Sequence, residues 1–135
     1  MPLVRIDLTD TYSEAQARSV ADEVHAAIVA EYGIPARDRF QIINRLPQTN
    51  IIAEDAGLGF ERSRGVVMIQ IFTQRGRATA KKQALYAAIA ARLAAIGVAG
   101  NDVFIGYNEN GPEDWSFGFG EAQYLTGQLK VPASA

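Results

Sequence analysis

The chain repeats its own pattern once, and this repeat limits the possible folds more than any other feature of the sequence. Residues 33–40 read GIPARDRF, and residues 97–104 read GVAGNDVF. The opening glycine and the inner aspartate keep one offset of 64 residues, from position 33 to 97 and from 38 to 102. A constant offset of this length indicates two copies of one structural unit. We therefore expect a single domain over residues 1–135, with internal repeats at about 2–60 and 66–125.

The first copy has the pattern of a strand, a helix and a second strand. Leu3–Leu8 alternates apolar and charged residues, which is typical of a strand. A capping-box pattern begins at Ser13 and predicts a helix that runs to Tyr32, because Gly33 follows. A second strand is predicted at Arg39–Leu46.

The second copy repeats this order. Val66–Phe72 is strongly apolar and predicts a strand. Thr79–Ile96 is rich in alanine and predicts a helix that Gly97 ends. Val103–Tyr107 predicts the last strand, and the residues after it lack a helical period. We expect short strands or a hairpin in this C-terminal part.

The repeat also predicts how the strands are arranged. A strand–helix–strand crossover is right-handed and makes its two strands parallel. A two-fold relation between the copies sets the two halves antiparallel to each other. The expected class is α+β, built from α/β-type units: a duplicated βαβ, with a four-stranded mixed sheet and two helices on one face. No further helix covers the other face, so we expect a homotrimer in which three sheets close around an axis.

Composition excludes several classes of function. The net charge of −2 gives no basic footprint for nucleic acid, so we expect no nucleic-acid partner. The chain has no cysteine and one histidine, which excludes disulfides, thiolate chemistry and a His-rich metal site. The first residues, PLVRIDLTD, read as neither a signal peptide nor a membrane span. We expect a cytoplasmic protein with no membrane partner, no metal and no cofactor.

The predicted topology gathers several reactive groups at one corner of the sheet. Pro2 opens the first strand, and Asp38 immediately precedes the second. Parallel strands begin at the same sheet edge, so these two residues should lie near each other. The third strand runs the opposite way and ends at this edge, just before Arg75 and Arg77. We expect all four residues at this corner.

The repeat shows which of these groups occur only once. A valine stands in the second copy where the first has Pro2, and threonine and serine stand in the first copy where the second has Arg75 and Arg77. Asp38 does have a twin, Asp102. A shared structural role of the two aspartates at the turn from helix to strand therefore stays open beside a catalytic role of Asp38.

The once-only groups suit acid–base work on a carboxylate. If Met1 is removed, the nitrogen of Pro2 becomes a free α-amine, which titrates near ~8 in model compounds and can act as acid or base. A neighbouring carboxylate such as Asp38 favours its protonated form, whereas nearby arginines and burial lower its pKa. Arg75 and Arg77 lie at a strand end and a helix start, where guanidinium forks and free N–H groups favour a carboxylate.

Two further sets of residues have a structural interpretation. His25 lies on the apolar stripe of the first helix and faces the sheet, where a lone histidine is more often a core residue. The aromatic residues of DWSFGFGEAQYLTG suit packing at a subunit interface.

The motifs resemble one branch of a known enzyme superfamily. They are PLVRIDL, Ala-His in the first helix, GIPARDRFQ, RGR after the third strand, DVFIGYNEN and DWSFG. Together they are similar to the malonate semialdehyde decarboxylase branch of the tautomerase superfamily, from Pro2 to about Leu129. That resemblance implies an N-terminal proline exposed by methionine removal, on a duplicated βαβ fold, in a trimer.

The resemblance also implies roles for particular residues. The proline of that branch works with an aspartate after the first helix and two arginines after the third strand, which match Pro2, Asp38, Arg75 and Arg77. The arginine pair is shifted here by one residue. Related cis-3-chloroacrylic acid dehalogenases have a substrate-contacting histidine near the place of His25. The apolar wall of the family matches the following residues: Trp115, Phe117, Tyr124 and Leu129.

These features favour a cofactor-independent lyase that acts on a small oxo-carboxylate. The reaction that we expect before the others is decarboxylation of a 3-oxo acid such as malonate semialdehyde. Two alternatives use the same fold: a keto–enol tautomerase of 2-oxo acids, of the phenylpyruvate type, and a hydratase or dehalogenase of 3-halo-acrylates. The dehalogenase usually needs an extra carboxylate to activate water, and the sequence shows no clear candidate beyond Asp38. A non-catalytic trimeric binding protein is the alternative of a different class.

Overall fold

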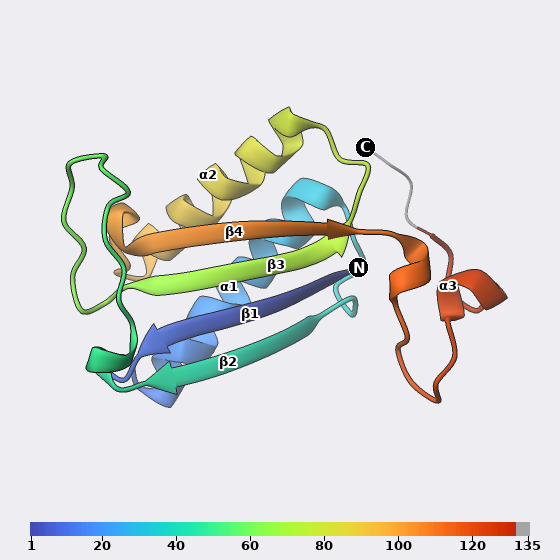
Figure 1. Ribbon diagram of the computed structural model, residues 1–135, viewed down its shortest axis with the longest axis horizontal. Coiled ribbons are helices and arrows are strands. Elements are labelled where there is room, and N and C mark those ends of the chain that lie inside the picture. The colour runs from blue at the N-terminus through green and yellow to red at the C-terminus, as the bar shows by residue number, and fades with distance from the viewer. Residues whose placement is uncertain (132–135) are drawn as a thin grey trace.

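A single mixed sheet forms the centre of the molecule (Figure 1). The computed structural model describes residues 1–131. Its strand order is β2-β1-β3-β4. β1 pairs with β2 and β3 with β4 in parallel, while the central pair β1 and β3 is antiparallel. The strands are β1 (Pro2–Thr9), β2 (Phe40–Leu46), β3 (Val67–Gln74) and β4 (Val103–Asn110).

The two long helices cover one face of the sheet, as the repeat predicts (Figure 1). They are α1 (Glu14–Tyr32) and α2 (Thr79–Ala95). The predicted capping box is present, because Ser13 and Gln16 exchange hydrogen bonds of 3.1 Å and 2.8 Å at the start of α1. Gly33 ends α1 in the left-handed region at φ 64°. The duplicated βαβ architecture is confirmed.

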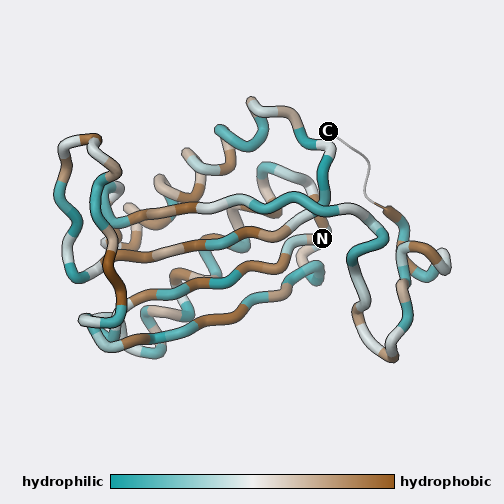
Figure 2. Tube along the Cα trace, in the orientation of Figure 1, coloured by the Kyte–Doolittle hydropathy of each residue, from teal (hydrophilic) through white to brown (hydrophobic). Residues whose placement is uncertain are grey.

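The core lies between the sheet and these helices. Alternate residues of β1 and β3 point toward the helices, and Figure 2 shows apolar and polar positions alternating along the strands. Burial of such side chains stabilises the fold by about 1.5–3 kcal/mol for each large one. The largest are Ile6, Leu8, Ile28, Ile69, Ile71, Leu85, Ile89 and Leu93.

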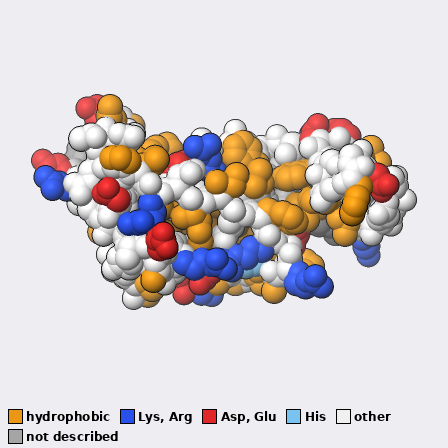
Figure 3. All heavy atoms as spheres, turned by 90° about the horizontal axis from the view of Figure 1, so that it is seen from below, with side chains coloured by type: hydrophobic (Ala, Val, Ile, Leu, Met, Phe, Trp, Pro, Cys, Tyr) orange, Lys and Arg blue, Asp and Glu red, His pale blue; other side chains and the backbone are white. Residues whose placement is uncertain are grey.

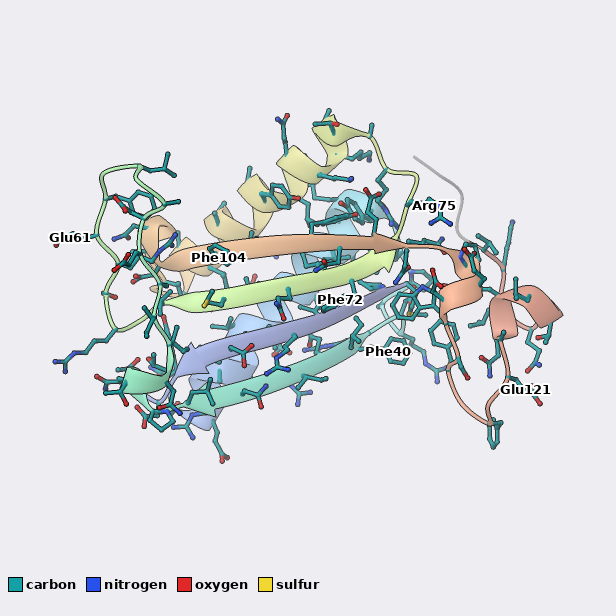
Figure 4. All side chains as sticks on the ribbon, in the orientation of Figure 1. Phe40, Glu61, Phe72, Arg75, Phe104 and Glu121 are labelled. Carbon is teal, nitrogen blue, oxygen red and sulfur yellow. The ribbon has the colours of Figure 1, made fainter. Side chains whose placement is uncertain are left out.

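The opposite face of the sheet has no helix over it. Phe40, Ile42 and Phe104 are 40%, 48% and 42% exposed there. In Figure 4 the labelled phenylalanines lie over the side of the sheet turned away from the helices. Figure 3 views the molecule from below, at right angles to Figure 1, and there too apolar side chains reach the surface beside lysine and arginine side chains. An apolar surface of this kind is typical of a face that another chain covers.

The C-terminal segment extends past the ends of the strands (Figure 1). The expectation of short strands is met by one antiparallel bridge between Gly118 and Glu121. β4 runs three residues further than the predicted Tyr107, because its last residues pair with the end of β3. The helical turns were not predicted. The short helices are η1 (Gln48–Asn50), η2 (Gly100–Asp102), η3 (Pro112–Asp114) and α3 (Gln123–Thr126).

Within residues 1–131, no helix combines the length and the apolar character that crossing a bilayer requires.

Candidate functional site

The strand register brings the predicted corner together. Pro2 lies opposite Thr73 near the end of β3, and Leu3 lies beside Phe40 at the start of β2. Asp38 stands two residues before β2, in the turn that follows α1. The start of β1, the start of β2 and the end of β3 therefore share one edge of the sheet. Arg75 and Arg77 follow β3 at this edge.

A buried amine and a buried carboxylate face each other at this corner. The amino nitrogen of Met1 lies 3.7 Å from Asp38 Oδ2, and the two side chains are 7% and 10% exposed. Burial raises the pKa of Asp38, while the amine, His25 and Arg77 pull it down. Burial also lowers the pKa of the amine, against the attraction of Asp38. Each group is thus less easily charged than in water.

The Asp38 carboxylate is incompletely satisfied. Its Oδ1 is buried, and no group within residues 1–131 forms a hydrogen bond with it. A separation of 3.7 Å between Oδ2 and the Met1 nitrogen is also too long for a hydrogen bond. A buried carboxylate oxygen without a partner is costly, so such an atom favours a function over a structural role.

The twin aspartate has the opposite surroundings. Asp102 is 5% exposed and accepts hydrogen bonds from the backbone nitrogen and the hydroxyl of Ser63. It thereby fixes the end of the loop that leads into β3. The structural role that the repeat left open therefore applies to Asp102, while Asp38 lacks such donors.

Arg77 is a half-buried cation beside this pair. Its Nη1 donates to Thr73 Oγ1 at 3.3 Å and to the Gln74 carbonyl at 3.5 Å. Its charge lowers the pKa of both Asp38 and the Met1 amine. In the described part of the chain, no carboxylate forms an ion pair with Arg77. A half-buried guanidinium without an anion is suited to bind one.

Arg75 has a different place. Its side chain is 61% exposed and pairs with Glu113 at 3.0 Å. Figure 4 shows it near the start of the C-terminal segment. The sequence places both arginines at this edge, but the structure separates them: Arg77 lies by the amine and Asp38, whereas the Arg75 guanidinium turns to Glu113.

His25 lies beneath the turn that carries Asp38. It is 9% exposed, and its Nε2 lies 2.8 Å from the carbonyl oxygen of Ala36. A carbonyl only accepts, so Nε2 carries the proton. This hydrogen bond ties the His25 ring to the turn, two residues before Asp38.

A cavity of about 360 Å³ opens at this corner. Three of the predicted wall residues line it: Phe117, Tyr124 and Leu129. Burial and the charge of Asp38 raise the pKa of Tyr124 to about 12, so its hydroxyl stays protonated at neutral pH. The full lining is Met1, Pro35, Arg37, Asp38, Phe40, Phe117, Tyr124, Leu129 and Lys130.

Trp115 supports the wall from behind. Its ring stacks on Phe117 at 5.8 Å and an angle of 5°, and its Nε1 donates to Asn110 Oδ1 at 2.9 Å. Phe117 also packs against Tyr124 and against Phe40, with ring centres 5.3 Å and 5.8 Å away. Sequence reasoning missed Phe40, although its place two residues after Asp38 was a usable signal.

Comparison with known families and proteins gives consistent matches. Two family models, each described as a tautomerase enzyme, match residues 2–61 and 38–118. "Probable tautomerase YrdN" of Bacillus subtilis (strain 168) is 39% identical over 130 residues, which are 96% of this chain and 100% of that protein. "Probable tautomerase YusQ" of the same strain is 34% identical over 93% of this chain and 99% of its own.

Solved structures agree with these matches. FG41 malonate semialdehyde decarboxylase inhibited by 3-bromopropiolate is 59% identical, with a TM-score of 0.94 over 96% of this chain and 99% of that one. A malonate semialdehyde decarboxylase described with decarboxylase and hydratase activities is 35% identical, with a TM-score of 0.89 over 94% and 98% of the two chains. A fused 4-OT symmetric trimer, at 20% identity and a TM-score of 0.75 over 93% and 98%, shares the fold alone. The branch expected from the sequence motifs is confirmed.

Proposed function

This chain belongs to the tautomerase family, and we propose that it is a cofactor-independent lyase whose working group is the amino nitrogen of Pro2, freed by removal of Met1. Its proposed substrate is a small 3-oxo acid such as malonate semialdehyde, as for the relative of 59% identity. The observation that carries the proposal is the half-buried Arg77, which forms no ion pair with a carboxylate of residues 1–131, beside Met1 and Asp38, which line an apolar cavity.

The proposed reaction divides the work between four residues. Arg77 holds the substrate carboxylate. Arg75 can assist when its guanidinium releases the exposed Glu113 and binds the substrate carboxylate instead. The Pro2 nitrogen, polarised by Asp38, hydrogen-bonds or protonates the carbonyl oxygen. Alternatively, it condenses with the carbonyl to an iminium with loss of one water, and water later hydrolyses the iminium to free the product and the amine. The bond from the carboxylate to the carbon between the two carbonyl groups then breaks. Its electron pair moves toward the activated oxygen or nitrogen, CO₂ departs, and a proton is later added to that carbon.

The wall of the cavity assists this step. Phe117, Tyr124 and Leu129 present a mostly apolar surface next to Asp38. Such a surface excludes water and strengthens the electrostatic effect of Arg77 on the substrate. It also favours a neutral product, CO₂, over a charged carboxylate. Trp115 stiffens this wall through its stack on Phe117.

The place of Met1 fits the need for its removal. Met1 is 6% exposed and lines the cavity, and its nitrogen occupies the position beside Asp38. While Met1 remains, the nitrogen of Pro2 is an amide that accepts no proton near neutral pH. Removal of one residue both empties part of the cavity and leaves the Pro2 amine at the edge of the sheet.

A homotrimer in the cytoplasm completes the proposal. The helix-free face of the sheet carries Phe40, Ile42 and Phe104 partly exposed, and the faces of three sheets can cover one another around an axis. The fused 4-OT relatives with this fold are described as trimers.

The test is a substrate panel with matched arginine variants. Met1-free protein is assayed for CO₂ release from a 3-oxo acid, for tautomerisation of a 2-oxo acid and for halide release from a 3-halo-acrylate. Loss of a charge-assisted hydrogen bond costs roughly 1.5–3 kcal/mol, so Arg77→Ala should lower kcat/KM about ten-fold to a hundred-fold. Arg75→Ala should lose less, because an exposed pair contributes little.

Arg64→Ala, an exposed arginine at the other end of the sheet, is the control and should react as the unchanged protein does. A 2-oxo acid turned over faster than any 3-oxo acid would favour the tautomerase alternative. Unchanged kinetics in Arg77→Ala would place the anion site elsewhere.

A further inference from the structure

The guanidinium of Arg77 rests on an aromatic ring. Its central carbon lies 4.1 Å from the centre of the Tyr32 ring, at the last residue of α1. The hydrogen bonds from Nη1 to Thr73 and Gln74, at 3.3 Å and 3.5 Å, are both long. Both hydrogen bonds hold the same nitrogen, so the contact that spans the whole guanidinium and fixes its plane is the face of the Tyr32 ring. Within residues 1–131, Nη2 and Nε of Arg77 have no hydrogen-bond partner, which leaves one edge of the fork available.

The Tyr32 ring is itself held in place. Its hydroxyl donates to the hydroxyl of Tyr107 on β4 at 3.1 Å. Two residues of α2 in turn contact Tyr107: the Tyr86 ring packs at 6.3 Å in an edge-to-face arrangement, and Lys82 Nζ lies 4.9 Å from the Tyr107 ring centre. Lys82 also pairs with Glu109 at 2.7 Å. The end of α1, the strand β4 and the first turn of α2 therefore meet at Tyr32.

We propose that Tyr32 is a positioning residue, whose ring orients the Arg77 guanidinium so that its open edge faces the substrate carboxylate. The proposal rests on the proposed function, because it assigns the source of affinity at the same anion site. The flat face of the ring attracts the cation and allows it to lie parallel, and neither property depends on the tyrosine hydroxyl. The hydroxyl only anchors the ring to Tyr107.

The experiment measures binding of malonate, an unreactive dicarboxylate, to the Met1-free protein by calorimetric titration, together with kcat and KM for the 3-oxo acid. Loss of a cation–π contact should raise the malonate Kd and the KM of Tyr32→Leu about two-fold to thirty-fold, with kcat nearly unchanged. Tyr32→Phe retains the ring and should stay within about two-fold of the unchanged protein. Phe60→Leu is the matched control, because the Phe60 ring carries the Arg62 guanidinium at 4.9 Å in the loop before β3, and this variant should bind malonate normally.

A double-mutant cycle separates positioning from general damage. In the Arg77→Ala background, Tyr32→Leu should have no further effect on the malonate Kd, because the cation that it orients is gone. Tyr32→Met replaces Tyr32→Leu if the leucine variant melts at a much lower temperature. Unchanged binding in folded Tyr32→Leu, or an equal loss in Phe60→Leu, would overturn the positioning role while Arg77→Ala still loses malonate. Malonate binding that survives Arg77→Ala would overturn the proposed anion site as well.

Discussion

Asp38 and Asp102 occupy equivalent positions in the two βαβ units, yet the surroundings of the two carboxylates differ. Asp102 receives two hydrogen bonds from Ser63, and it closes the turn into β3. Asp38 has one buried oxygen without a partner among residues 1–131, and an amine at 3.7 Å. A duplicated unit can keep one copy of a residue for stability and use the other for chemistry.

Alanine substitution should separate these roles. Asp102→Ala leaves the Ser63 donors unpaired and should lower the free energy of unfolding by about 1–3 kcal/mol, with kcat/KM retained in the folded fraction. Asp38→Ala removes a buried, poorly satisfied carboxylate and should leave the free energy of unfolding unchanged or raise it, while kcat/KM collapses. Urea denaturation and steady-state kinetics measure both. Equal loss of stability in the two variants would mean that both aspartates are structural.

The difference in stability between the unchanged chain and Asp38→Ala should depend on pH. Burial raises the pKa of Asp38 in the folded chain, so between the ordinary carboxyl pKa near ~4 and the raised value the folded state binds more protons than the unfolded state. Asp38 then contributes a loss of stability as pH rises through this window. The melting temperature of Asp38→Ala should therefore rise relative to that of the unchanged chain as the pH is raised from 4 toward neutrality.

Several site residues follow from the sequence, and others depend on packing. The strand order alone places Pro2, Asp38 and the arginines at one edge, because parallel strands start together. The direction of the Arg75 side chain does not follow, since its partner Glu113 lies in a segment without a periodic pattern. The family resemblance assigns Trp115 to the wall of the cavity. In the structure its ring stacks on Phe117, which lines the cavity, and Trp115 is not itself among the lining residues.

At the scale of elements, the turn after α1 positions the site. Gly33 ends the helix at φ 64° and directs the chain toward Asp38, while His25 holds the Ala36 carbonyl of the same turn. The strands and long helices were predictable because alternation and capping patterns are local. The C-terminal segment was not, because its turns depend on contacts with the rest of the molecule.

Gly33→Ala should cost about 1–2 kcal/mol of stability, because a residue with a Cβ is disfavoured in the left-handed region. The cost is conformational, since an added Cβ would meet nothing within 4 Å. Gly100→Ala is the matched control: an added Cβ is equally free there, without the left-handed backbone. It should change stability by less than about 0.5 kcal/mol. Thermal unfolding of the two variants checks this, and an equal effect would contradict the role of Gly33.

At the scale of the whole molecule, the helix-free face predicts the assembly. Light scattering at micromolar concentration should give about three times the 14.6 kDa of one chain. Ile42→Glu places a charge on the open face and should yield a smaller species, because a buried charge without a partner is costly. Ala87→Glu, on the exposed side of α2, should remain trimeric. A measured mass equal to that of one chain for the unchanged protein would contradict the proposed trimer.

The central claim is that the free nitrogen of Pro2 does the chemistry, and the direct test is turnover measured against the fraction of chains that retain Met1. Protein made with and without active methionine aminopeptidase is weighed by intact mass and assayed on the 3-oxo acid, with circular dichroism as the control for folding. Activity should follow the Met1-free fraction, because Met1 converts the Pro2 amine to an amide and lies in the cavity beside Asp38. Pro2→Ala, a primary amine, should fall between the two forms. A Met1-retaining chain as active as the processed one would contradict the account.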